Sequence, residues 1–198
     1  MEAMGIVRRS KSSWASPLHV VAKSDRGWRP CGDYRRLNNV TVDDRYPVPR
    51  LQDFTANLQG KSVFSKVDLV RGYHQIPMSP EDVQKTAVIT PFGLYEFLCM
   101  PFGLKNAALA FQRLVDTVCR GLQGVFVYLD DILIASTSNT QHQEDLKVMF
   151  KCLEEHGLVT NSKKCVFGTP AVRFLGHSVD SSGISPLPEK VQTVRDFE

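Results

Sequence analysis

Two adjacent aspartates, Asp130 and Asp131, separate two strongly apolar runs, Val125–Leu129 and Ile132–Ala135. Runs rich in branched and aromatic residues predict β-strands, and a gap of two residues leaves room only for a tight hairpin turn. The chain is therefore expected to reverse here and to present two acidic side chains at a hairpin tip.

An Asp–Asp pair in a turn is common, because aspartate hydrogen-bonds its own backbone and tolerates left-handed conformations. Here, however, both flanking strands are apolar and are expected to lie across a core. Two carboxylates in such surroundings repel each other unless a cation offsets their charge. Carboxylate oxygens are ligands that Mg²⁺ prefers. The hairpin therefore predicts a divalent metal site, with ordinary turn chemistry as the alternative.

A third carboxylate, Asp68, lies near the end of the alternating run Ser62–Leu69. A neighbouring strand could bring it within reach of the hairpin. Two metal ions about 3.5–4 Å apart, bridged by such acids, activate an attacking hydroxyl and stabilise a leaving pyrophosphate. The pattern indicates the chemistry of palm-type polymerases; the alternative is that Asp68 caps a turn at its strand end.

The remaining pattern alternates short strands with helices, and its first two extended segments form a basic β-hairpin. This order predicts an α+β domain, an antiparallel sheet with helices packed on one face. We expect Asn106 to cap its helix, and Leu146, Phe150 and Leu153 to face inward on theirs. The expected extended segments are Trp14–Lys23, Trp28–Tyr34, Ser62–Leu69, Thr86–Thr90, Leu94–Met100 and Cys165–Val179, and the expected helices are Leu51–Leu58, Asn106–Gly121, Gln143–His156 and a proline-started helix from Glu189.

Composition excludes several other classes of protein. Of 198 residues, 42% are hydrophobic and 23% are charged, which is ordinary for a globular domain and argues against disorder, a collagen-like repeat or a coiled coil. No window approaches about 18 uncharged apolar residues, so no membrane span is expected. The five cysteines form no CxxC pair and are odd in number, which argues against a disulfide frame or a zinc knuckle.

The net charge of +3 is unevenly distributed along the chain. Residues 1–50 hold 10 Lys and Arg against 5 Asp and Glu, a balance of +5. This amino-terminal quarter is suited to contact phosphate, although a basic segment is more often a solvated face.

Five segments follow one another as sequence motifs: Trp28–Asn38, Phe64–Ile76, Met100–Ala107, Tyr128–Leu133 and Phe174–His177. Their order and spacing resemble the motif set of the reverse transcriptases of Gypsy-type LTR retrotransposons. The resemblance covers essentially the whole chain, from about Ile6 to Phe197. It implies a palm-type polymerase fold with an N-terminal fingers subdomain that contains the basic β-hairpin.

The resemblance implies that Asp68, Asp130 and Asp131 form the catalytic, metal-binding triad. Asp68 and Asp130 would be the main ligands of two Mg²⁺ ions, for which Mn²⁺ can substitute, and the carbonyl of Leu69 would add an oxygen. Of the three, Asp131 is the one whose direct ligation of metal the resemblance supports least.

Further residues match the family's nucleotide-binding positions. Tyr73 corresponds to the aromatic steric gate that excludes a ribose 2′-hydroxyl, with a packed strand tyrosine as the alternative. Arg29 would hold triphosphate oxygens, and Lys23 would add a charge there unless it is a solvated hairpin residue. Phe102 and Gly103 would back the nucleotide at the start of the helix that Asn106 begins.

A last motif resembles the primer grip, a hairpin that seats the primer 3′ end against the aspartates. It comprises Phe174, Leu175, Gly176 and His177, of which the first two would otherwise be core residues. The family usually has proline or alanine and then threonine or serine before Phe-Gln, whereas this chain has Ala108-Leu109-Ala110. Because the replacements are apolar and compatible with a helix, they cast little doubt on activity.

Three residues lack ligand-spaced partners and are expected to be structural or to lie on the surface: His142, His156 and Cys165.

The whole chain, 1–198, is expected to be a partial reverse transcriptase domain of a larger Pol polyprotein. Fingers-like ranges are expected at 1–60 and 86–115, palm ranges at 61–85 and 116–180, and the start of the connection to the thumb at 181–198. The thumb, connection, RNase H, protease and integrase regions are expected to be absent from this chain. The expected partners are an RNA or DNA template with primer, dNTPs and the remaining Pol domains, with no membrane, and the expected location is the cytoplasm, within retroelement particles.

Three functions compete at this point. The first is an RNA-directed DNA polymerase core that transfers dNTPs onto a primer 3′ end. The second is a truncated or co-opted retroelement fragment that binds nucleic acid without polymerising; the intact aspartates and Tyr73 argue against advanced decay. The third, a palm-type RNA polymerase, is disfavoured by the bulk of Tyr73.

Overall fold

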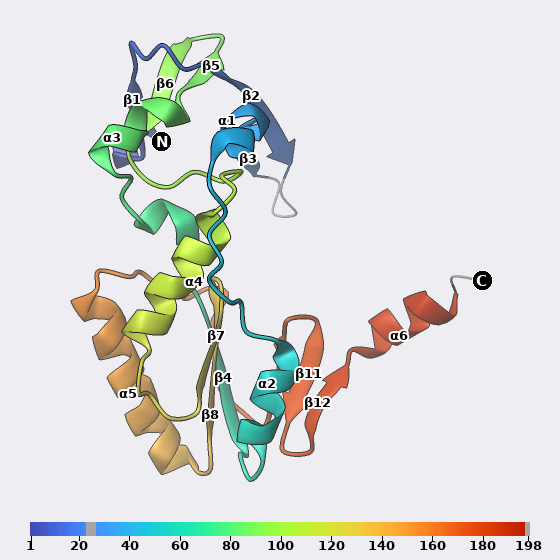
Figure 1. Cartoon of the computed structure of the whole chain (residues 1–198). Helices are drawn as coiled ribbons and strands as arrows, with labels where there is room; N and C mark the ends of the chain where they lie inside the picture. Colours follow the sequence, from blue (N-terminus) through green and yellow to red (C-terminus); the bar gives the residue numbers. More distant parts are fainter. Residues whose placement is uncertain (23–26, 197–198) are drawn as a thin grey trace. The chain divides into compact units, whose positions relative to one another are not determined.

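The computed structural model describes residues 1–22 and 27–196. Two compact units interleave along the chain. Unit 1 comprises Met1–Tyr46 and Arg71–Phe111, and unit 2 comprises Pro47–Val70 and Gln112–Glu198. Unit 1 has one sheet and unit 2 has two (Figure 1). Each unit also has its own core of buried residues. The assignment of fingers and palm to residue ranges remains a prediction.

Unit 1 contains a five-stranded sheet in the order β1-β6-β5-β2-β3. The expected basic hairpin pairs Leu18 with Gly32 and Ala22 with Trp28, and the expected second hairpin pairs Val88 with Tyr95. The sheet is mixed rather than wholly antiparallel, because β2 runs parallel to β5. The strands are β1 (Val7–Arg9), β2 (Ser16–Ala22), β3 (Trp28–Gly32), β5 (Val88–Thr90) and β6 (Gly93–Phe97).

Short helices cover the core of unit 1, in which Ile6, Tyr34, Val88 and Phe97 are buried. The buried Tyr34 hydroxyl donates to the Thr86 carbonyl at 2.8 Å, which satisfies its one polar atom. The helical elements are η1 (Glu2–Met4), α1 (Arg35–Val40), η3 (Gly72–Gln75), α3 (Pro80–Val83) and η4 (Gln84–Thr86), and α4 (Ala107–Val118) begins here and continues into unit 2.

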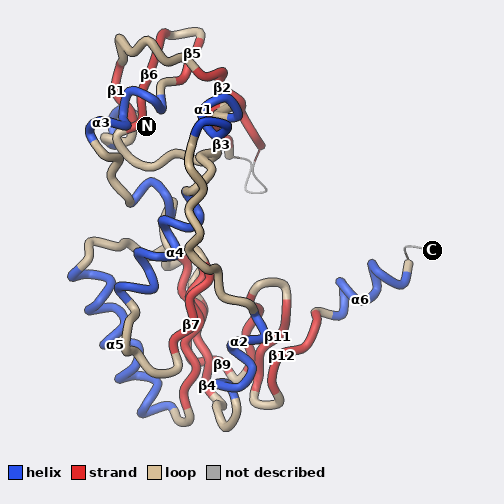
Figure 2. The backbone as a smooth tube through the Cα atoms, in the orientation of Figure 1, coloured by secondary structure: helices blue, strands red, loops and turns tan. Residues whose placement is uncertain are grey.

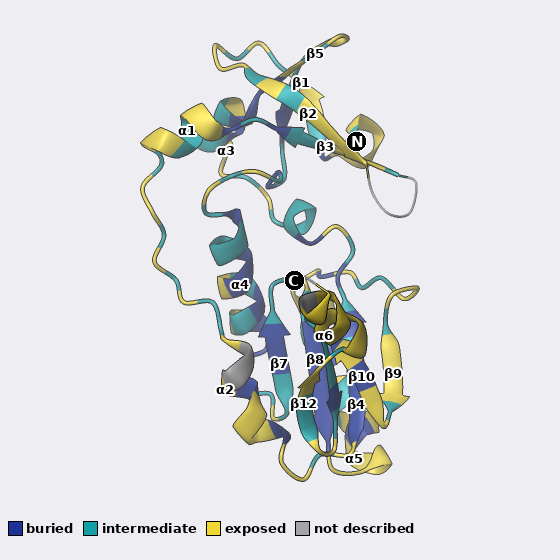
Figure 3. Cartoon of the chain, turned by 90° about the vertical axis from the view of Figure 1, so that its right-hand side faces the viewer, coloured by how far each residue is buried: buried dark blue, intermediate teal, exposed yellow. Residues whose placement is uncertain are grey.

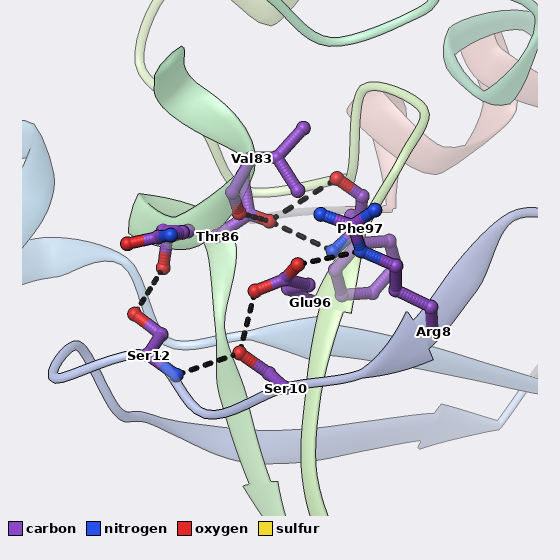
Figure 4. Close-up of polar contacts among 8 residues, drawn as sticks. Arg8, Ser10, Ser12, Val83, Thr86, Glu96 and Phe97 are labelled. Atoms are coloured by element: carbon purple, nitrogen blue, oxygen red, sulfur yellow. Dashed lines mark hydrogen bonds and ion pairs between the residues drawn. The ribbon is translucent and has the colours of Figure 1, made fainter. Parts of the chain in front are cut away.

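The buried carboxylate of Glu96 on β6 hydrogen-bonds to side chains in and directly after strand β1. Glu96 accepts hydrogen bonds from Arg8 Nε at 2.7 Å and from Ser10 Oγ at 2.5 Å (Figure 4). Burial raises the pKa of the Glu96 carboxyl, but these two hydrogen bonds and the Arg8 charge outweigh burial and lower it overall. The carboxylate is therefore held in its charged form.

Unit 2 is built on a four-stranded antiparallel sheet in the order β7-β8-β4-β9. Its strands are β7 (Val125–Tyr128), β8 (Asp131–Ser136), β4 (Val63–Asp68) and β9 (Val166–Thr169). The central strands β4 and β8 are almost completely buried, whereas the edge strand β9 is exposed (Figure 3).

Both faces of this sheet are covered. Helix α5 (Asn139–Glu155) lies against β8 and β4 on one face (Figure 1). On the other face, Phe54 of α2 (Leu51–Thr55) packs against Phe126 and Phe174, and η2 (Ala56–Leu58) contributes Leu58 to the same core. The long expected segment Cys165–Val179 divides between sheets, because only β9 belongs to this one.

A separate three-stranded antiparallel sheet follows β9 (Figure 2). It consists of β10 (Ala171–Phe174), β11 (His177–Asp180) and β12 (Gly183–Pro186). Helix α6 (Pro188–Arg195) comes next and begins with a proline, as expected. No helix within the described residues is long and apolar enough to cross a membrane.

Helix α5 differs from the expected one at its start and in its buried face. It begins at Asn139 because the Ser138 side chain accepts a hydrogen bond from Gln141 N and caps it. Its fully buried residues are His142, Met149 and Leu153. Leu146 and Phe150 are half-buried, and the Phe150 ring centre lies 6.0 Å from that of Phe167 on β9. The expected inward face is therefore confirmed for Leu153 and in part for the other two. A buried histidine occupies part of the face that the apolar pattern assigned to those residues.

Candidate active site

The aspartate hairpin forms as expected, but only one aspartate lies in its turn. Tyr128 pairs with Asp131, which is already the first residue of β8. The two turn residues are therefore Leu129 and Asp130, and Leu129 adopts a φ of 52°. Hairpin turns with a positive φ follow the twist of the flanking strands. The expectation that Asp130 and Asp131 together form the tip is thus corrected.

A buried glutamine holds this strained turn. The side chain of Gln112 on α4 accepts a hydrogen bond from Leu129 N at 2.7 Å and donates to Val127 O at 3.2 Å. It also donates to Asp116 Oδ1 at 2.9 Å. Because Gln112 is fully buried, these bonds fix the hairpin to the helix.

Asp68 ends β4 directly opposite Asp131. Beyond this pair, Leu69 N donates to Asp130 O at 3.2 Å, so the backbones of all three predicted catalytic residues are linked. Asn161 N donates to Asp68 O at 2.7 Å, and Cys165 Sγ accepts from Asp68 N at 3.4 Å. Cys165, which was expected to be structural or at the surface, therefore supports the Asp68 backbone.

Two lysines face these carboxylates. Lys66 Nζ lies 2.8 Å from Asp131 Oδ1, and Lys164 Nζ lies 3.8 Å from Asp68 Oδ2. Burial raises the pKa of Asp68, the charge of Lys164 opposes this shift, and Asp131 and Asp130 reinforce it. The site therefore favours a cation beside Asp68.

The donor chemistry of this corner fits a hard divalent cation, because its three side chains are carboxylates beside backbone carbonyls. The raised pKa of Asp68, caused first by burial, shows that its charge is incompletely compensated. Within residues 1–22 and 27–196, however, no group of three or more His, Cys, Asp or Glu side chains could hold a metal ion as arranged. The residues thus suit the metal chemically, and a ligand cluster is not preformed.

The predicted primer-grip residues form the tight turn between β10 and β11. Phe174 pairs with His177, and both turn residues have positive φ, 48° at Leu175 and 73° at Gly176. Phe174 is completely buried in the unit 2 core, whereas His177 Nδ1 interacts with Leu175 O at 3.0 Å.

An open groove of about 860 Å³ joins this turn to the aspartate hairpin. Tyr128, which pairs with Asp131, forms one part of its lining, and Leu175 and His177 form another. The groove therefore connects the predicted primer grip with the strand that precedes Asp130. Its other lining residues are Val48, Pro49, Arg50, Thr55, Ile184 and Pro186.

The predicted nucleotide-binding residues of unit 1 also come together. The Arg29 guanidinium lies 4.7 Å from the ring centre of Phe102, and the Tyr73 ring centre lies 5.0 Å from it. Tyr73 also packs edge-on against Phe111 at 5.5 Å. Tyr73 belongs to η3 and not to a strand, but it is packed, so its role as a steric gate stays a prediction with packing as the alternative. Lys23 lies outside the described residues.

Gly103 is required by a close approach of two backbone segments. Its φ is 98°, and a Cβ at this position would lie 2.9 Å from Gly32 O. Asn38 secures the same turn by donating to Gly103 O at 2.8 Å and accepting from Lys105 N at 2.9 Å. The amide oxygen of Asn106 accepts from Asp44 N at 3.2 Å, so this side chain bonds to a loop and does not cap α4 as expected.

Sequence reasoning missed four supporting residues: Lys66, Gln112, Asn38 and Lys164. Lys66 carried a usable signal, because it lies two residues before Asp68 and hence on the same strand face. Asn38 and Gln112 are polar residues inside or beside motifs, but their partners depend on contacts between distant segments.

Comparison with known proteins identifies the family. The sequence profile described as Reverse transcriptase (RNA-dependent DNA polymerase) matches residues 21–179. The chain belongs to the reverse transcriptase family. This confirms the resemblance seen in the five motifs, and the family uses divalent metal ions.

Several retroelement polyproteins are similar to this reverse transcriptase chain over 98% of its length. The Pol polyproteins of transposons 297 and gypsy from Drosophila melanogaster are 41% and 36% identical to it. The Tf2-3 polyprotein of Schizosaccharomyces pombe is 34% identical. The chain spans only 19%, 19% and 15% of these three relatives.

Solved structures confirm the palm-type polymerase fold. A foamy viral protease–reverse transcriptase in complex with double-stranded DNA matches 98% of this chain and 41% of its own, with a TM-score of 0.90 and 25% identity. A second foamy viral structure, also with double-stranded DNA, covers the whole chain and 35% of its own, with a TM-score of 0.93 at 24% identity.

Proposed function

We propose that this chain is the polymerase core of a retroelement reverse transcriptase and adds dNTPs to a primer 3′ end on an RNA or DNA template. The observation that carries the proposal is the pairing of Asp68 with Asp131 across β4 and β8, beside the turn residue Asp130. Family membership and structural neighbours bound to double-stranded DNA or an RNA/DNA hybrid support it.

In this proposal, Asp68 and Asp130 hold the metal ions, with the Leu69 carbonyl as a further oxygen. Two bound Mg²⁺ ions would lower the pKa of the primer 3′-hydroxyl and stabilise the leaving pyrophosphate. The groove is the proposed seat of the primer end, because it is lined by Tyr128, which pairs with Asp131, and by Leu175 and His177 of the predicted primer grip.

The unit 1 cluster has a separate proposed role toward the incoming nucleotide. Arg29 would bind triphosphate oxygens, and its stacking on Phe102 limits the directions in which the guanidinium points. Tyr73 would exclude a 2′-hydroxyl, since its ring is fixed by Phe102 and Phe111. Phe102 and Gly103 would form the surface behind the nucleotide.

Primer extension on an RNA template with dNTPs and Mg²⁺ tests this function. We expect Asp68→Asn to lower incorporation by at least about a hundredfold, because electrostatic stabilisation at the reacting phosphate is lost. Asp196→Asn is the matched control, since Asp196 bonds only locally to Gln192 at 2.8 Å in the exposed end of the chain. Chelation of the metal should abolish extension by both the wild type and this control.

A different outcome would favour the second function. If the wild-type chain binds template and primer but does not extend the primer, it acts as a nucleic-acid-binding fragment without catalysis. Equal extension by the wild type and Asp68→Asn would contradict the proposed site itself.

A further inference from the structure

Lys66 is a charged residue inside an otherwise buried strand. Its neighbours Ser65 and Val67 are fully buried, and Lys66 itself retains only 22% of its side-chain exposure. Lysine is mostly exposed in folded proteins and is almost never fully buried unless its charge is paired, so a partly buried Lys66 calls for a partner. Side chains alternate along a strand, so Lys66 lies on the same face as Asp68.

The register of β4 and β8 explains which carboxylate pairs with this lysine. Asp68 stands opposite Asp131, and Lys66 stands opposite Leu133, one step further along the same face. Lys66 Nζ reaches diagonally to Asp131 Oδ1 at 2.8 Å, and the Asp131 side chain is 25% exposed. The ion pair is thus partly buried at both of its members.

The other lysine of the site makes a much looser contact. Lys164 Nζ is 3.8 Å from Asp68 Oδ2, and the Lys164 side chain is 64% exposed. Exposed ion pairs contribute little because water screens them, whereas partly buried pairs are stronger. Asp131 therefore has a close and partly buried cation, whereas the cation paired with Asp68 is more distant and exposed.

We propose that Lys66 is a positioning residue that serves as the permanent counter-cation of Asp131 and so withdraws this aspartate from the metal-binding set. Metal binding is then left to Asp68 and Asp130. The inference rests on the proposed function, from which it takes the metal-binding site. It adds a role for Lys66, which lies outside the predicted triad. Asp131 then pairs with Lys66, whereas Asp130 binds the metal.

Calorimetric titration with Mg²⁺ alone, without nucleic acid or dNTP, tests this division of roles. Asp130→Asn should weaken Mg²⁺ binding at least about tenfold more than Asp131→Asn does, since only the former removes a ligand. Lys66→Met should tighten Mg²⁺ binding by at least about threefold, because a nearby positive charge is lost and Asp131 is released. Adding Asp131→Asn to Lys66→Met should remove that gain.

Thermal unfolding in a metal chelator provides a second readout that needs neither metal nor activity. Lys66→Met should lower the melting temperature by about 2–4 °C more when Asp131 is present than in the Asp131→Asn background. Lys66→Arg should restore the wild-type value because it keeps the charge. Lys147→Met, which removes an exposed pair with Glu144, should behave identically in both backgrounds.

The outcomes separate this inference from the proposed function. Mg²⁺ binding that is unaffected by Lys66→Met, or additive melting shifts for Lys66→Met and Asp131→Asn, would overturn the role of Lys66 alone. Absence of Mg²⁺ binding by the wild type would overturn the division of metal-binding roles in the free chain, while primer extension would decide separately on the proposed function and the melting measurement on the Lys66–Asp131 pair. If Lys66→Met does not fold, Lys66→Gln is measured in the same way.

Discussion

The position of the Tyr73 ring is set by its aromatic neighbours. Tyr73 lies in η3, which begins directly after Arg71, a residue with a left-handed φ of 50°. The rings of Phe102 and Phe111, 5.0 and 5.5 Å away, then hold it from two sides. A ring held in this way can act as a steric wall without contributing chemistry of its own.

Sugar discrimination is the property expected to depend on this ring. Tyr73→Ala should lower the preference for dNTP over rNTP by at least about tenfold, because removing the ring relieves a clash with a 2′-hydroxyl. Single-nucleotide insertion kinetics with both substrates measure the ratio. Tyr73→Phe is the matched control, since it keeps the ring and should keep the ratio. An unaltered ratio in Tyr73→Ala would assign the residue to packing alone.

At the scale of elements, a buried polar network joins α5 to the sheet of unit 2. His142 Nε2 lies 2.6 Å from Ser65 Oγ on β4, and its Nδ1 lies 2.8 Å from Ser136 Oγ on β8. Ser136 also donates to Asp145 at 2.5 Å, and Gly168 N of β9 donates to Ser65 Oγ at 3.0 Å. One histidine thus connects a helix with both central strands.

The network makes the stability of unit 2 sensitive to acid. Burial lowers the pKa of His142, and the Asp145 charge opposes this shift only in part. Because the unfolded state binds the proton more readily, the contribution of His142 is complete above a pH of about 6.5 and is lost as the pH falls toward its lowered folded pKa.

We therefore expect the melting temperature of the wild type to fall more steeply between about pH 7 and 5.5 than that of His142→Gln, which cannot titrate. Each 1 kcal/mol of lost stability should appear as about 2–4 °C in a chain of this size. Calorimetry across this range measures the two slopes. His156→Gln is a suitable control because His156 is exposed. Parallel slopes for wild type and His142→Gln would refute the linkage.

The elements that the sequence predicts well are those with a strong local pattern. The β7–β8 hairpin follows from apolar runs around Asp130 and Asp131, and α4 follows from its apolar spacing. Strand β1 and helix α1 were not expected, because β1 depends on pairing with the distant strand β6 and α1 is short. Local propensity cannot reveal such long-range partners.

In the candidate site, too, local sequence patterns predict some residues, whereas others depend on contacts between distant segments. Motifs identify Asp68, Asp130 and Asp131 because each stands at the end of an apolar strand. The pairing of Lys66 with Asp131 depends on the register of β4 against β8, which only the folded chain displays. On α5, hydrophobic spacing finds Leu153 but not His142, which is buried through its serine partners, a property that such spacing does not encode.

At the scale of the whole molecule, the chain passes between its two units three times, after Tyr46, Val70 and Phe111. Neither unit is therefore a continuous segment, and α4 runs unbroken across the last of these boundaries. Unfolding of one unit would release the other at all three of these connections. This connectivity favours a single cooperative unfolding transition over two independent ones.

The two tryptophans make this testable, because Trp14 and Trp28 both belong to unit 1. Phe64 is fully buried in the unit 2 core, and Phe64→Ala should cost about 3–5 kcal/mol, or roughly 6–20 °C in melting temperature. Under one cooperative transition, tryptophan fluorescence should report the same lowered melting temperature as far-UV circular dichroism. Phe97→Ala in the unit 1 core is the control and should lower both signals. A fluorescence transition that stays at the wild-type temperature in Phe64→Ala would show that the units unfold separately, since its reporters lie entirely outside the unit that was weakened.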